Sequence, residues 1–477
     1  MPGYSVKSGV DRKDRECEIV TTQIEVVSER TGYGFLHLSD IHFGQERGGE
    51  VFINREIKKD LVRFLKDVKA KREKAGLLPV DGVVVTGDIA FSGKANEYRD
   101  ASEWLAQITD ALGCKETSVH VVPGNHDVDR KKISPGVHAI IDQVMEKGQE
   151  ALDLYLSDET DRERLYDRFS EYRVFAAGYG CRLDREGGAA GTKDFPLRNG
   201  LKLRFIGMNS ALICRGRDED AEPGKLFLGA KQRAVSMDDG VEQIILMHHP
   251  ISWLADGPDS WNYFKNRARI FISGHEHRPD LGVDEIEGNG TVLRIDSGAT
   301  VPPKGEDGHG YTFNIIDLAL DDQNAALNVV VRGYIWDRGT TSFREDHERF
   351  AGNHEHELCL PCPRFARVNV ESGGSGADDL AEKVAPTGSQ EVAAEASMGI
   401  DEERFAELRL KYFHSLTPLQ RLEILVDLAI LPSDWSGSLT SALELSAIEA
   451  IAGMGRLDDL EEAIGKYAAG AGNGAGE

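Results

Sequence analysis

Short apolar runs, each ending at a cluster of polar residues, are the most regular feature of this sequence. Each run is rich in Val, Ile, Leu or Phe, which is typical of a strand buried on both faces. The runs occupy residues 34–38, 82–86, 118–122, 244–247 and 269–273. Helical stretches at 54–75, which has a charged outer face, and at 95–112 separate the first three runs. This alternation of strand and helix predicts an α/β layered sheet.

The pattern changes after the third run. Residues 129–200 contain charged amphipathic helix, for example at 162–178, and a Gly-rich loop at 187–191. We interpret this segment as a helical insertion over the rim of the sheet rather than as a separate core. Further apolar runs without long helices between them predict a second, partly antiparallel sheet, and they occupy residues 203–208, 292–295, 311–318 and 327–335. Residues 32–370 are therefore predicted to form one domain, preceded by an N-terminal extension at 1–31.

The C-terminal region has a different composition. Residues 371–400 mix Gly, Ser, Ala and Glu without aromatic residues, which predicts a flexible linker. Residues 401–468 have helical patterning throughout and predict a small all-α domain. The low-complexity residues 469–477 predict a disordered tail.

The clearest helix start in this C-terminal unit is a capping box. The run Thr417-Pro418-Leu419-Gln420 places Thr before the first turn, Pro within it and Gln three residues after Thr. This run predicts a helix that continues through Leu431. Apolar-periodic stretches at 439–451 and 457–467 predict two more helices.

Length and charge narrow the functional classes. A chain of 477 residues with 40% hydrophobic content is long enough for two or three folded units. The formal net charge of −25 argues against a surface that coats nucleic acids, because Lys and Arg hold phosphate backbones. The charge does not exclude a phosphate substrate, since bound cations would reverse the local field.

The absence of two kinds of segment suggests a cellular location. The sequence shows neither an apolar stretch that would span a membrane nor the apolar core of a signal peptide. We therefore expect a cytoplasmic protein without a membrane partner. Its six cysteines are scattered through the chain, which fits reduced thiols better than a disulfide framework.

The polar clusters that follow the five apolar runs carry the candidate chemistry. They are Asp40-Ile41-His42, Gly87-Asp88, Gly124-Asn125-His126-Asp127, His248-His249-Pro250 and Gly274-His275-Glu276-His277. In α/β sheets, ligands bind at the carboxyl ends of strands, so these clusters are expected to meet at one rim. A hydrophobic core has no use for such a set of carboxylates, amide and imidazoles, whereas a pair of divalent metal ions does.

These five clusters, in this order over about residues 32–318, resemble those of the calcineurin-like metallophosphoesterase superfamily. The resemblance implies a two-sheet α/β sandwich that holds two divalent metal ions, which would be Mn, Fe or Zn. The first metal would be bound by Asp40, His42 and His277. The second would be bound by Asn125, His248 and His275, with Asp88 bridging both.

The resemblance also implies a mechanism. A hydroxide that bridges the two metals would attack phosphorus in line with the leaving oxygen. His126 would protonate the leaving group or stabilise its charge, and Asp127 would orient His126.

Four neighbouring residues have simpler interpretations. His37 alternates with apolar residues inside the first strand and His120 lies inside another, so both are predicted to be structural. His249 follows the predicted ligand directly and would support it or contact phosphate. Glu276 lies between two predicted ligands and is expected to face away from them.

A second group of potential ligands lies near the end of the domain and consists of His354, His356, Cys359 and Cys362. The C-x-x-C spacing suits zinc. However, no second C-x-x-C appears, and Pro361 and Pro363 favour an ordinary turn.

The resemblance favours a phosphodiesterase. Block 124–127 ends in Asp, as in phosphodiesterase-like relatives, whereas protein phosphatases of the superfamily typically have Glu there. The substrate would be a cyclic nucleotide or an oligonucleotide, although the 129–200 insertion departs from the short cyclic-nucleotide phosphodiesterases. Two alternatives stay open: a phosphomonoesterase or protein phosphatase, and a catalytically vestigial scaffold that acts through its C-terminal helices.

The C-terminal run 412–421 resembles the effector-associated helical adaptors of bacterial conflict systems. Such adaptors recruit proteins through contacts between helical bundles, which implies a protein partner for residues 401–468. Any small helical bundle gives the same amphipathic pattern, so a purely structural unit is the alternative.

Overall fold

The computed structural model describes residues 30–45, 52–183, 190–217, 221–287, 290–301, 310–371 and 401–470. The predicted N-terminal extension and linker lie almost entirely outside the described residues, as do most of the predicted tail and part of the Gly-rich loop at 187–191.

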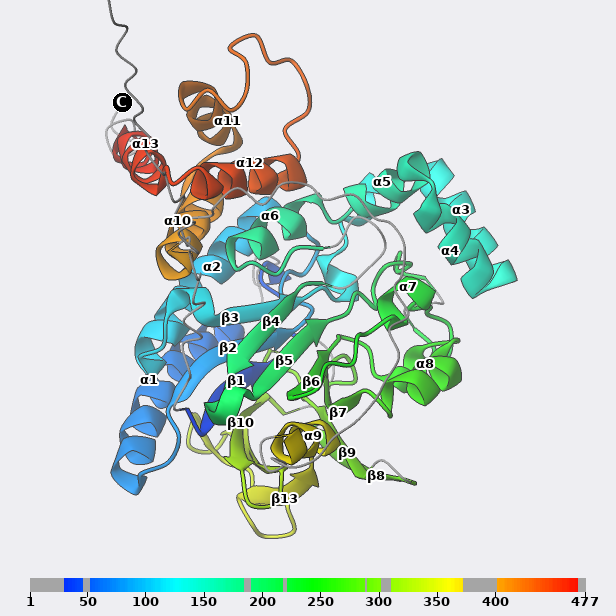
Figure 1. Ribbon diagram of the computed structural model, residues 1–477, viewed down its shortest axis with the longest axis vertical. Helices are drawn as coiled ribbons and strands as arrows, with labels where there is room; N and C mark the ends of the chain where they lie inside the picture. Colours follow the sequence, from blue (N-terminus) through cyan, green and yellow to red (C-terminus); the bar gives the residue numbers. More distant parts are fainter. Residues whose placement is uncertain are drawn as a thin grey trace, which may run out of the picture.

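Among the described residues, seven strands form the first sheet, in the order β12-β11-β10-β1-β2-β3 with β13 beside β11. Figure 1 shows β10, β1, β2 and β3 side by side. Strands β1, β2 and β3 are parallel, and β10 runs antiparallel to β1. The strands are β1 (Gly32–Leu38), β2 (Val80–Thr86), β3 (Val119–Val122), β10 (Thr312–Asp321), β11 (Ala326–Asp337), β12 (Ser342–Glu345) and β13 (Glu355–Pro361).

Six strands form the second sheet, in the order β4-β5-β6-β7-β9-β8. Its four central strands are parallel, and the two edge strands are antiparallel to their neighbours. The strands are β4 (Thr192–Pro196), β5 (Lys202–Gly207), β6 (Val241–Leu246), β7 (Ala268–Ser273), β8 (Asp280–Ile286) and β9 (Gly290–Asp296).

The five predicted strands ahead of the polar clusters are confirmed, but the predicted make-up of the second sheet is wrong. The runs at 311–318 and 327–335 were assigned to it, yet β10 and β11 pair with β1 in the first sheet. The second sheet instead contains β6 and β7, which carry two of the polar clusters. Local apolar patterning carries no information on which of two sheets a strand joins, because pairing depends on distant neighbours.

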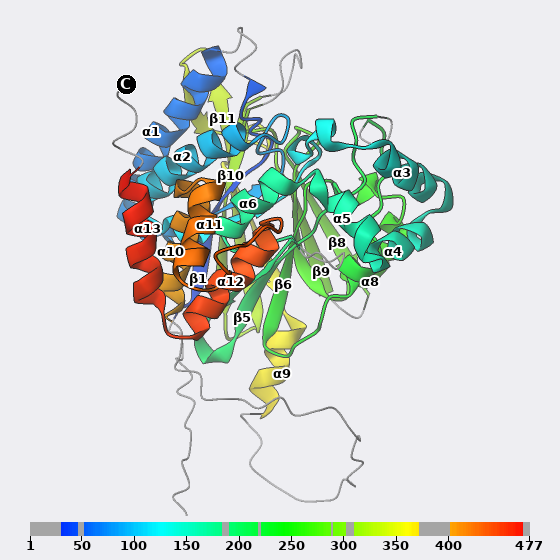
Figure 2. The same ribbon diagram turned by 90° about the horizontal axis from the view of Figure 1, so that it is seen from above.

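The two sheets pack face to face and helices cover their outer faces (Figure 2). Between the sheets, the ring of Phe35 in β1 lies 4.8 Å from that of Phe205 in β5, centroid to centroid. Outside the first sheet, the indole of Trp104 in α2 donates to the carbonyl of Lys58 in α1 (3.0 Å). The covering helices are α1 (Phe52–Ala75), α2 (Ala95–Leu112), α7 (Ala230–Arg233), α8 (Gly257–Phe264) and α9 (Pro363–Glu371). The fold is thus the expected two-sheet α/β sandwich.

The insertion is helical, as expected, and most of its buried apolar residues join the main core. Its helices are α3 (Pro135–Lys147), α4 (Gln149–Ser157), α5 (Glu159–Asp167) and α6 (Ser170–Gly178). The single helix predicted at 162–178 is wrong, because the chain breaks between α5 and α6. The break occurs at Arg168, whose buried guanidinium donates to the carbonyl groups of Cys214 (2.7 Å) and Leu212. Strand β4, which follows α6, was not predicted.

Among the described residues, the C-terminal unit consists of four helices, which lie together in Figure 1. They are α10 (Glu402–Ser415), α11 (Pro418–Asp427), α12 (Ser441–Gly453) and α13 (Leu457–Gly470). The capping box is confirmed, since the Thr417 N–H donates to the Gln420 side-chain oxygen (2.8 Å) and the Gln420 N–H donates to the Thr417 hydroxyl (3.4 Å). Helix α11 ends before the predicted Leu431, because Ala429 adopts a left-handed backbone (φ 58°) and Pro432 follows.

These four helices have their own apolar core, in which Tyr412, Ile424, Ile448 and Leu460 are completely buried. A buried ion pair between Arg421 and Glu444 (2.6 Å) joins α11 to α12. None of the described helices in either unit combines the length and apolar character that a membrane crossing demands.

Candidate metal centre

The strand ends of both sheets converge on one site. Strands β1, β2 and β3 bring Asp40, Asp88 and Asn125 to this rim, and β6 and β7 bring His248 and His275 from the second sheet. The structure therefore places the seven predicted ligands together, although it draws them from two sheets. Groups of ligand atoms lie within 4.8 Å of one another in four overlapping sets: Asp40, His42 and His277; Asp40, Asp88 and His248; His42, Asp88 and His126; and His248, His249 and His275.

One half of the site is centred on Asp40. One of its carboxylate oxygens lies 3.1 Å from Nε2 of His277, and the other accepts the backbone N–H of His275 (3.1 Å). Nε2 of His42 lies 3.3 Å from Oδ2 of Asp88. These side chains are buried or nearly so, which keeps bulk water from screening their charges.

The other half is centred on His248. Its Nε2 lies 3.1 Å from the side-chain oxygen of Asn125 and 3.2 Å from Nδ1 of His275. The same nitrogen lies 3.4 Å from Oδ2 of Asp88. Asp88 therefore contacts a histidine of each half, which is the position that the sequence analysis gave to a bridging ligand.

Backbone carbonyl groups fix the orientation of two imidazoles. Nδ1 of His248 lies 2.7 Å from the carbonyl oxygen of Thr86, and Nδ1 of His42 lies 3.1 Å from that of Val301. A carbonyl oxygen can only accept, so each Nδ1 carries a hydrogen and each ring directs its Nε2 at the Asp88 carboxylate. A positive charge at these Nε2 atoms, from a metal ion or a proton, would compensate the charge of that carboxylate. The donor set thus fits divalent metal ions.

The electrostatics of the site point the same way. Burial opposes a charged His248, but the Asp88 and Asp40 carboxylates and the Thr86 carbonyl together outweigh burial and raise the pKa of His248 to about 9. Burial likewise opposes a charged Asp88, yet His248 and His126 hold its pKa well below the ordinary value. The site therefore stabilises positive charge next to Asp88.

Five of the predicted ligands have a left-handed backbone. The φ angles lie between 51° and 73°, and the residues are Asp40, His42, Asp88, His275 and His277. Residues other than Gly rarely adopt this conformation, which costs about 1–3 kcal/mol each and concentrates at functional sites. The turn at each strand end thus costs stability and directs the side chain into the site.

Two glycines allow the loops to approach closely. A Cβ atom on Gly124 would lie 2.1 Å from Oδ1 of Asp88, and one on Gly274 would lie 1.9 Å from the hydroxyl of Ser39. The hydrogen-bonded contact of the His126 N–H with Oδ1 of Asp88 (2.8 Å) depends on the same close approach. Glycine is therefore required at both positions for the loops to meet.

We predict that Gly124→Ala destabilises the protein by about 1–3 kcal/mol, because the added methyl group collides with the Asp88 carboxylate. Thermal unfolding with and without Mn²⁺ measures the effect, and the stabilisation by Mn²⁺ should shrink as Asp88 moves. Gly465→Ala is the control, because its Cβ would have no neighbour within 4 Å. A Gly124→Ala protein as stable as wild type would contradict the crowding argument.

His126 lies at the edge of the cluster, partly exposed. Its Nδ1 lies 2.9 Å from the carbonyl oxygen of Phe91, and its ring stacks on the Phe91 ring at 5.3 Å. The carbonyl fixes hydrogen on Nδ1 and leaves Nε2 as the exchangeable nitrogen.

The prediction that Asp127 orients His126 is wrong. The Asp127 carboxylate accepts the N–H groups of Gly124 (2.9 Å) and Ala90 (2.9 Å) and the hydroxyl of Tyr98 (3.0 Å). It thereby ties the loop after β2 to the loop after β3. Burial, with the nearby charge of Asp88, raises its pKa to about 7. Adjacency in the sequence suggested the His–carboxylate pair, but η3 (Asn125–Asp127), a single 3-10 turn, directs the two side chains differently.

The structure agrees with the structural interpretation of His37 and His120. Nε2 of His37 lies 2.9 Å from the Thr86 hydroxyl inside the sheet, and burial lowers the pKa of His37 to about 3. His120 packs against the rings of Phe195 and Phe205.

His249 contacts the predicted ligand His275 directly, and Glu276 contacts it through Trp253. Nδ1 of His249 lies 2.9 Å from the Ser210 hydroxyl, and its ring is 4.3 Å from that of His275. Glu276 accepts the indole N–H of Trp253 (2.9 Å), whose ring packs edge-on against His275 at 4.1 Å. Glu276 thus supports a predicted ligand indirectly.

The second histidine–cysteine group does not form a cluster. Among the described residues, the sets that could hold a metal do not include His354, His356, Cys359 or Cys362. His356 and Cys359 lie in the edge strand β13, and the chain passes from this strand into α9 at Cys362, between the two prolines that suggested a turn. In this region Cys359 is exposed and Cys362 is buried.

Sequence reasoning missed three residues that support the site. Phe91 acts through its carbonyl group, Tyr98 through a hydroxyl on the buried face of α2, and Trp253 through a ring from a short 3-10 turn. A contact made by a backbone carbonyl group cannot be predicted from the residue type, because every residue has such a group. A buried Tyr on a helix was the only available signal, since a buried phenol requires a hydrogen-bond partner.

Comparison with known families gives two matches. Residues 33–279, more than half of the chain, match the model of the calcineurin-like phosphoesterase family. Residues 404–466 match the model of the GTPase-associated adaptor domain.

Individual proteins are more distant. The chain is 24% identical over 318 residues to the "uncharacterized metallophosphoesterase-like protein YydB" of Bacillus subtilis, over 63% of this chain and 59% of that protein. A single-mutant Vps29 from Entamoeba histolytica aligns at 12% identity with a TM-score of 0.28, over 68% of this chain and 98% of that one. A 5′-nucleotidase from Candida albicans aligns at 10% identity with a TM-score of 0.27, over 62% and 48% of the two chains.

Proposed function

The chain belongs to the calcineurin-like phosphoesterase family, and we propose that it is a phosphodiesterase that uses two divalent metal ions. One observation carries this proposal: backbone carbonyl groups hold His42 and His248 so that both Nε2 atoms face the Asp88 carboxylate. Two imidazole nitrogens fixed around one carboxylate suit two divalent ions that share that carboxylate.

We assign the metals as the sequence analysis did. Asp40, His42 and His277 would hold one ion, and Asn125, His248 and His275 the other, with Asp88 shared. Carboxylate, imidazole and amide ligands accept Mn, Fe or Zn. When bound, two such ions lower the pKa of a water molecule and neutralise charge on the phosphoryl oxygens.

The residues of the chain supply the remaining steps. The doubly protonated form of His126 would deliver a proton from Nε2 to the leaving oxygen, while Nδ1 keeps its hydrogen on the Phe91 carbonyl, which holds the ring in place. Asp127 would keep the loops of Asp88 and Asn125 in register. His249 would support His275 from behind.

The preference for a diester rests on the Asp that ends block 124–127. A cyclic nucleotide or an oligonucleotide fits that preference, whereas a phosphomonoester or phosphoprotein is the alternative. A catalytically vestigial scaffold is the third hypothesis. Such a protein would be expected to lack at least one metal-ligand residue. The sequence has a residue of ligand type at all seven predicted positions, and the contacts among these side chains support an active site rather than a vestigial one.

The test is hydrolysis of a panel by protein stripped of metal and then supplied with Mn²⁺, Fe²⁺ or Zn²⁺. We expect no turnover without metal and faster turnover of bis-p-nitrophenyl phosphate than of p-nitrophenyl phosphate. The panel also contains 3′,5′- and 2′,3′-cyclic nucleotides and single-stranded DNA. Faster hydrolysis of the monoester would favour the phosphomonoesterase, and inertness with all three metals would refute catalysis.

A protein partner is proposed for the C-terminal helices. The match of residues 404–466 to an adaptor domain supports recruitment of a partner linked to a GTPase. The helices have a separate apolar core, which lets them act as a recognition unit beside the phosphoesterase domain.

A further inference from the structure

The C-terminal helices contact the phosphoesterase domain around the side chain of His414 in α10. We call the site that receives this ring, formed by Phe175, Gly178 and Tyr179, the His414 seat. The His414 ring lies parallel to the Phe175 ring of α6 at 5.5 Å and edge-on to Tyr179 at 4.8 Å. Its Nε2 donates to the carbonyl of Phe175 (2.8 Å). A Cβ on Gly178 would lie 2.4 Å from that nitrogen, so the seat exists only because position 178 is glycine.

Each of the two units also buries an apolar residue in the core of the other. Leu410 of α10 is buried in the apolar core of the phosphoesterase domain, and Ala177 of α6 is buried in the core of the C-terminal helices. Arg409 of α10 donates to the carbonyl of Gly178 (3.3 Å). The contact between α10 and α6 is therefore specific in shape, apolar burial and hydrogen bonding.

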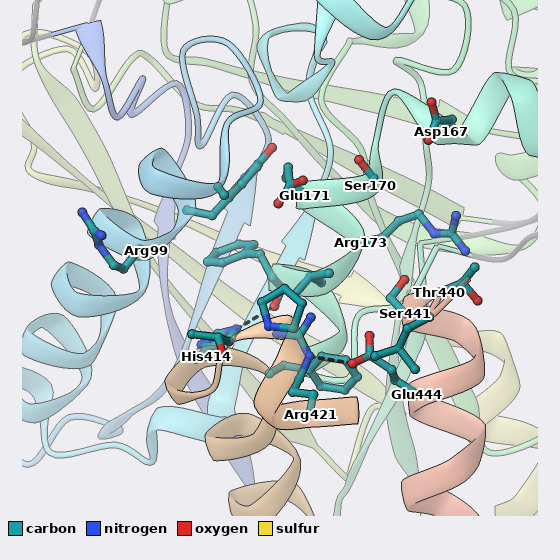
Figure 3. Close-up of a pocket in the computed structure, with 18 of the residues that line it drawn as sticks. Arg99, Asp167, Ser170, Glu171, Arg173, His414, Arg421, Thr440, Ser441 and Glu444 are labelled. Carbon is teal, nitrogen blue, oxygen red and sulfur yellow. Dashed lines mark hydrogen bonds and ion pairs between the residues drawn. The ribbon is translucent and has the colours of Figure 1, made fainter. Parts of the chain in front are cut away.

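Beside this contact the two units separate into a groove of about 1030 Å³. Figure 3 shows Glu171 and Arg173 of α6 on one side, with Ser441 and Glu444 of α12 on the other. The C-terminal helices are therefore attached to α6 mainly through α10, with a smaller contact from α12. The two units are not packed together where the groove lies. Docked and undocked arrangements of the C-terminal helices are the two states that such an attachment allows.

A continuous line of contacts leads from His414 to the candidate metal centre. The Phe175 ring that carries His414 packs at 5.1 Å against the ring of Tyr98 in α2. The Tyr98 hydroxyl donates to the Asp127 carboxylate (3.0 Å). Asp127 in turn accepts the N–H groups of Ala90 and Gly124, next to Asp88 and Asn125.

We propose that docking of α10 on α6 positions the metal-site loops, and that His414, Phe175 and Tyr98 are the positioning residues. The proposal rests on the proposed function of the same site and adds its regulation. A partner that draws α10 away from α6 lowers activity, because Phe175 and Tyr98 lose their support and Asp127 no longer holds the two loops together. Packed side chains that link two sites commonly change the coupling between them by a measurable amount.

The experiment compares full-length wild type with His414→Ala, Gly178→Leu and Tyr98→Phe. Hydrogen–deuterium exchange, Mn²⁺ titration calorimetry and steady-state hydrolysis are measured on each protein. His414→Ala and Gly178→Leu should raise exchange in α10, in α6 and in segments 87–92 and 123–129, and should lower kcat and Mn²⁺ affinity roughly threefold to tenfold. Tyr98→Phe should loosen the same two segments while α10 stays protected.

Glu407→Ala is the matched control, because it lies exposed on the same helix and should match wild type in every measurement. The proposal is overturned if the two docking variants loosen α10 but leave both loop segments and Mn²⁺ affinity at wild-type values. Unchanged exchange in α10 would equally overturn it, since His414 would then not seat the helix. If wild type hydrolyses no substrate, the proposed function fails, while exchange and calorimetry still decide the coupling.

Discussion

Asp88→Asn is expected to lower kcat by about 10³-fold or more and to reduce metal binding from two ions to at most one. Asp88 contacts His42 in one half of the site and His248 in the other, and is buried. An amide has no negative charge to share between two cations. A loss of ~4 kcal/mol of charge stabilisation corresponds to this rate. Steady-state kinetics and metal analysis of the dialysed protein measure both effects.

The control for Asp88→Asn is Asp259→Asn, the same chemical change at an exposed position on α8. It should leave turnover and metal content unchanged. Full turnover by Asp88→Asn with two bound metals would remove the bridging role, and with it the assignment of the two halves.

His126→Ala is expected to lower kcat by about 10²–10⁴-fold on a substrate with a poor leaving group, without loss of metal. His126 presents Nε2 beside the cluster while the Phe91 carbonyl fixes its other nitrogen. A nitrophenolate leaves readily without a proton, so the variant should lose far less activity on bis-p-nitrophenyl phosphate than on an alkyl phosphodiester. Equal losses on both substrates would mean that His126 does not serve as the proton donor.

The sequence was enough to predict which candidate ligands come together, but not which residues hold those ligands in position. Asp40, Asp88 and His275 follow short apolar runs, and the rule that ligands gather at strand ends is enough to bring them together. Whether they bind metal stays a prediction. The role of Asp127 was misjudged because its partners are the backbone N–H groups of Gly124 and Ala90, which the sequence does not mark.

The predictions of the fold were wrong or incomplete where the structure depends on contacts between residues that are far apart in the sequence. Strand β10 has the same local pattern as a strand of either sheet, but its partner β1 lies almost three hundred residues earlier. The break between α5 and α6 depends on Arg168 reaching carbonyl groups at 212 and 214. The seat of His414 on α6 joins two segments whose separate patterns are ordinary amphipathic helices.

The division of the metal-site residues between two sheets has a consequence for biosynthesis. Asp40, Asp88 and Asn125 leave the ribosome long before His248 and His275, so a nascent chain at first holds only part of the candidate metal site. The proposed metal pair would therefore need both sheets, and sheets held together by contacts between distant residues form slowly. Chains stalled before β7 would lack His275 and His277 and would bind fewer metal ions than the complete chain.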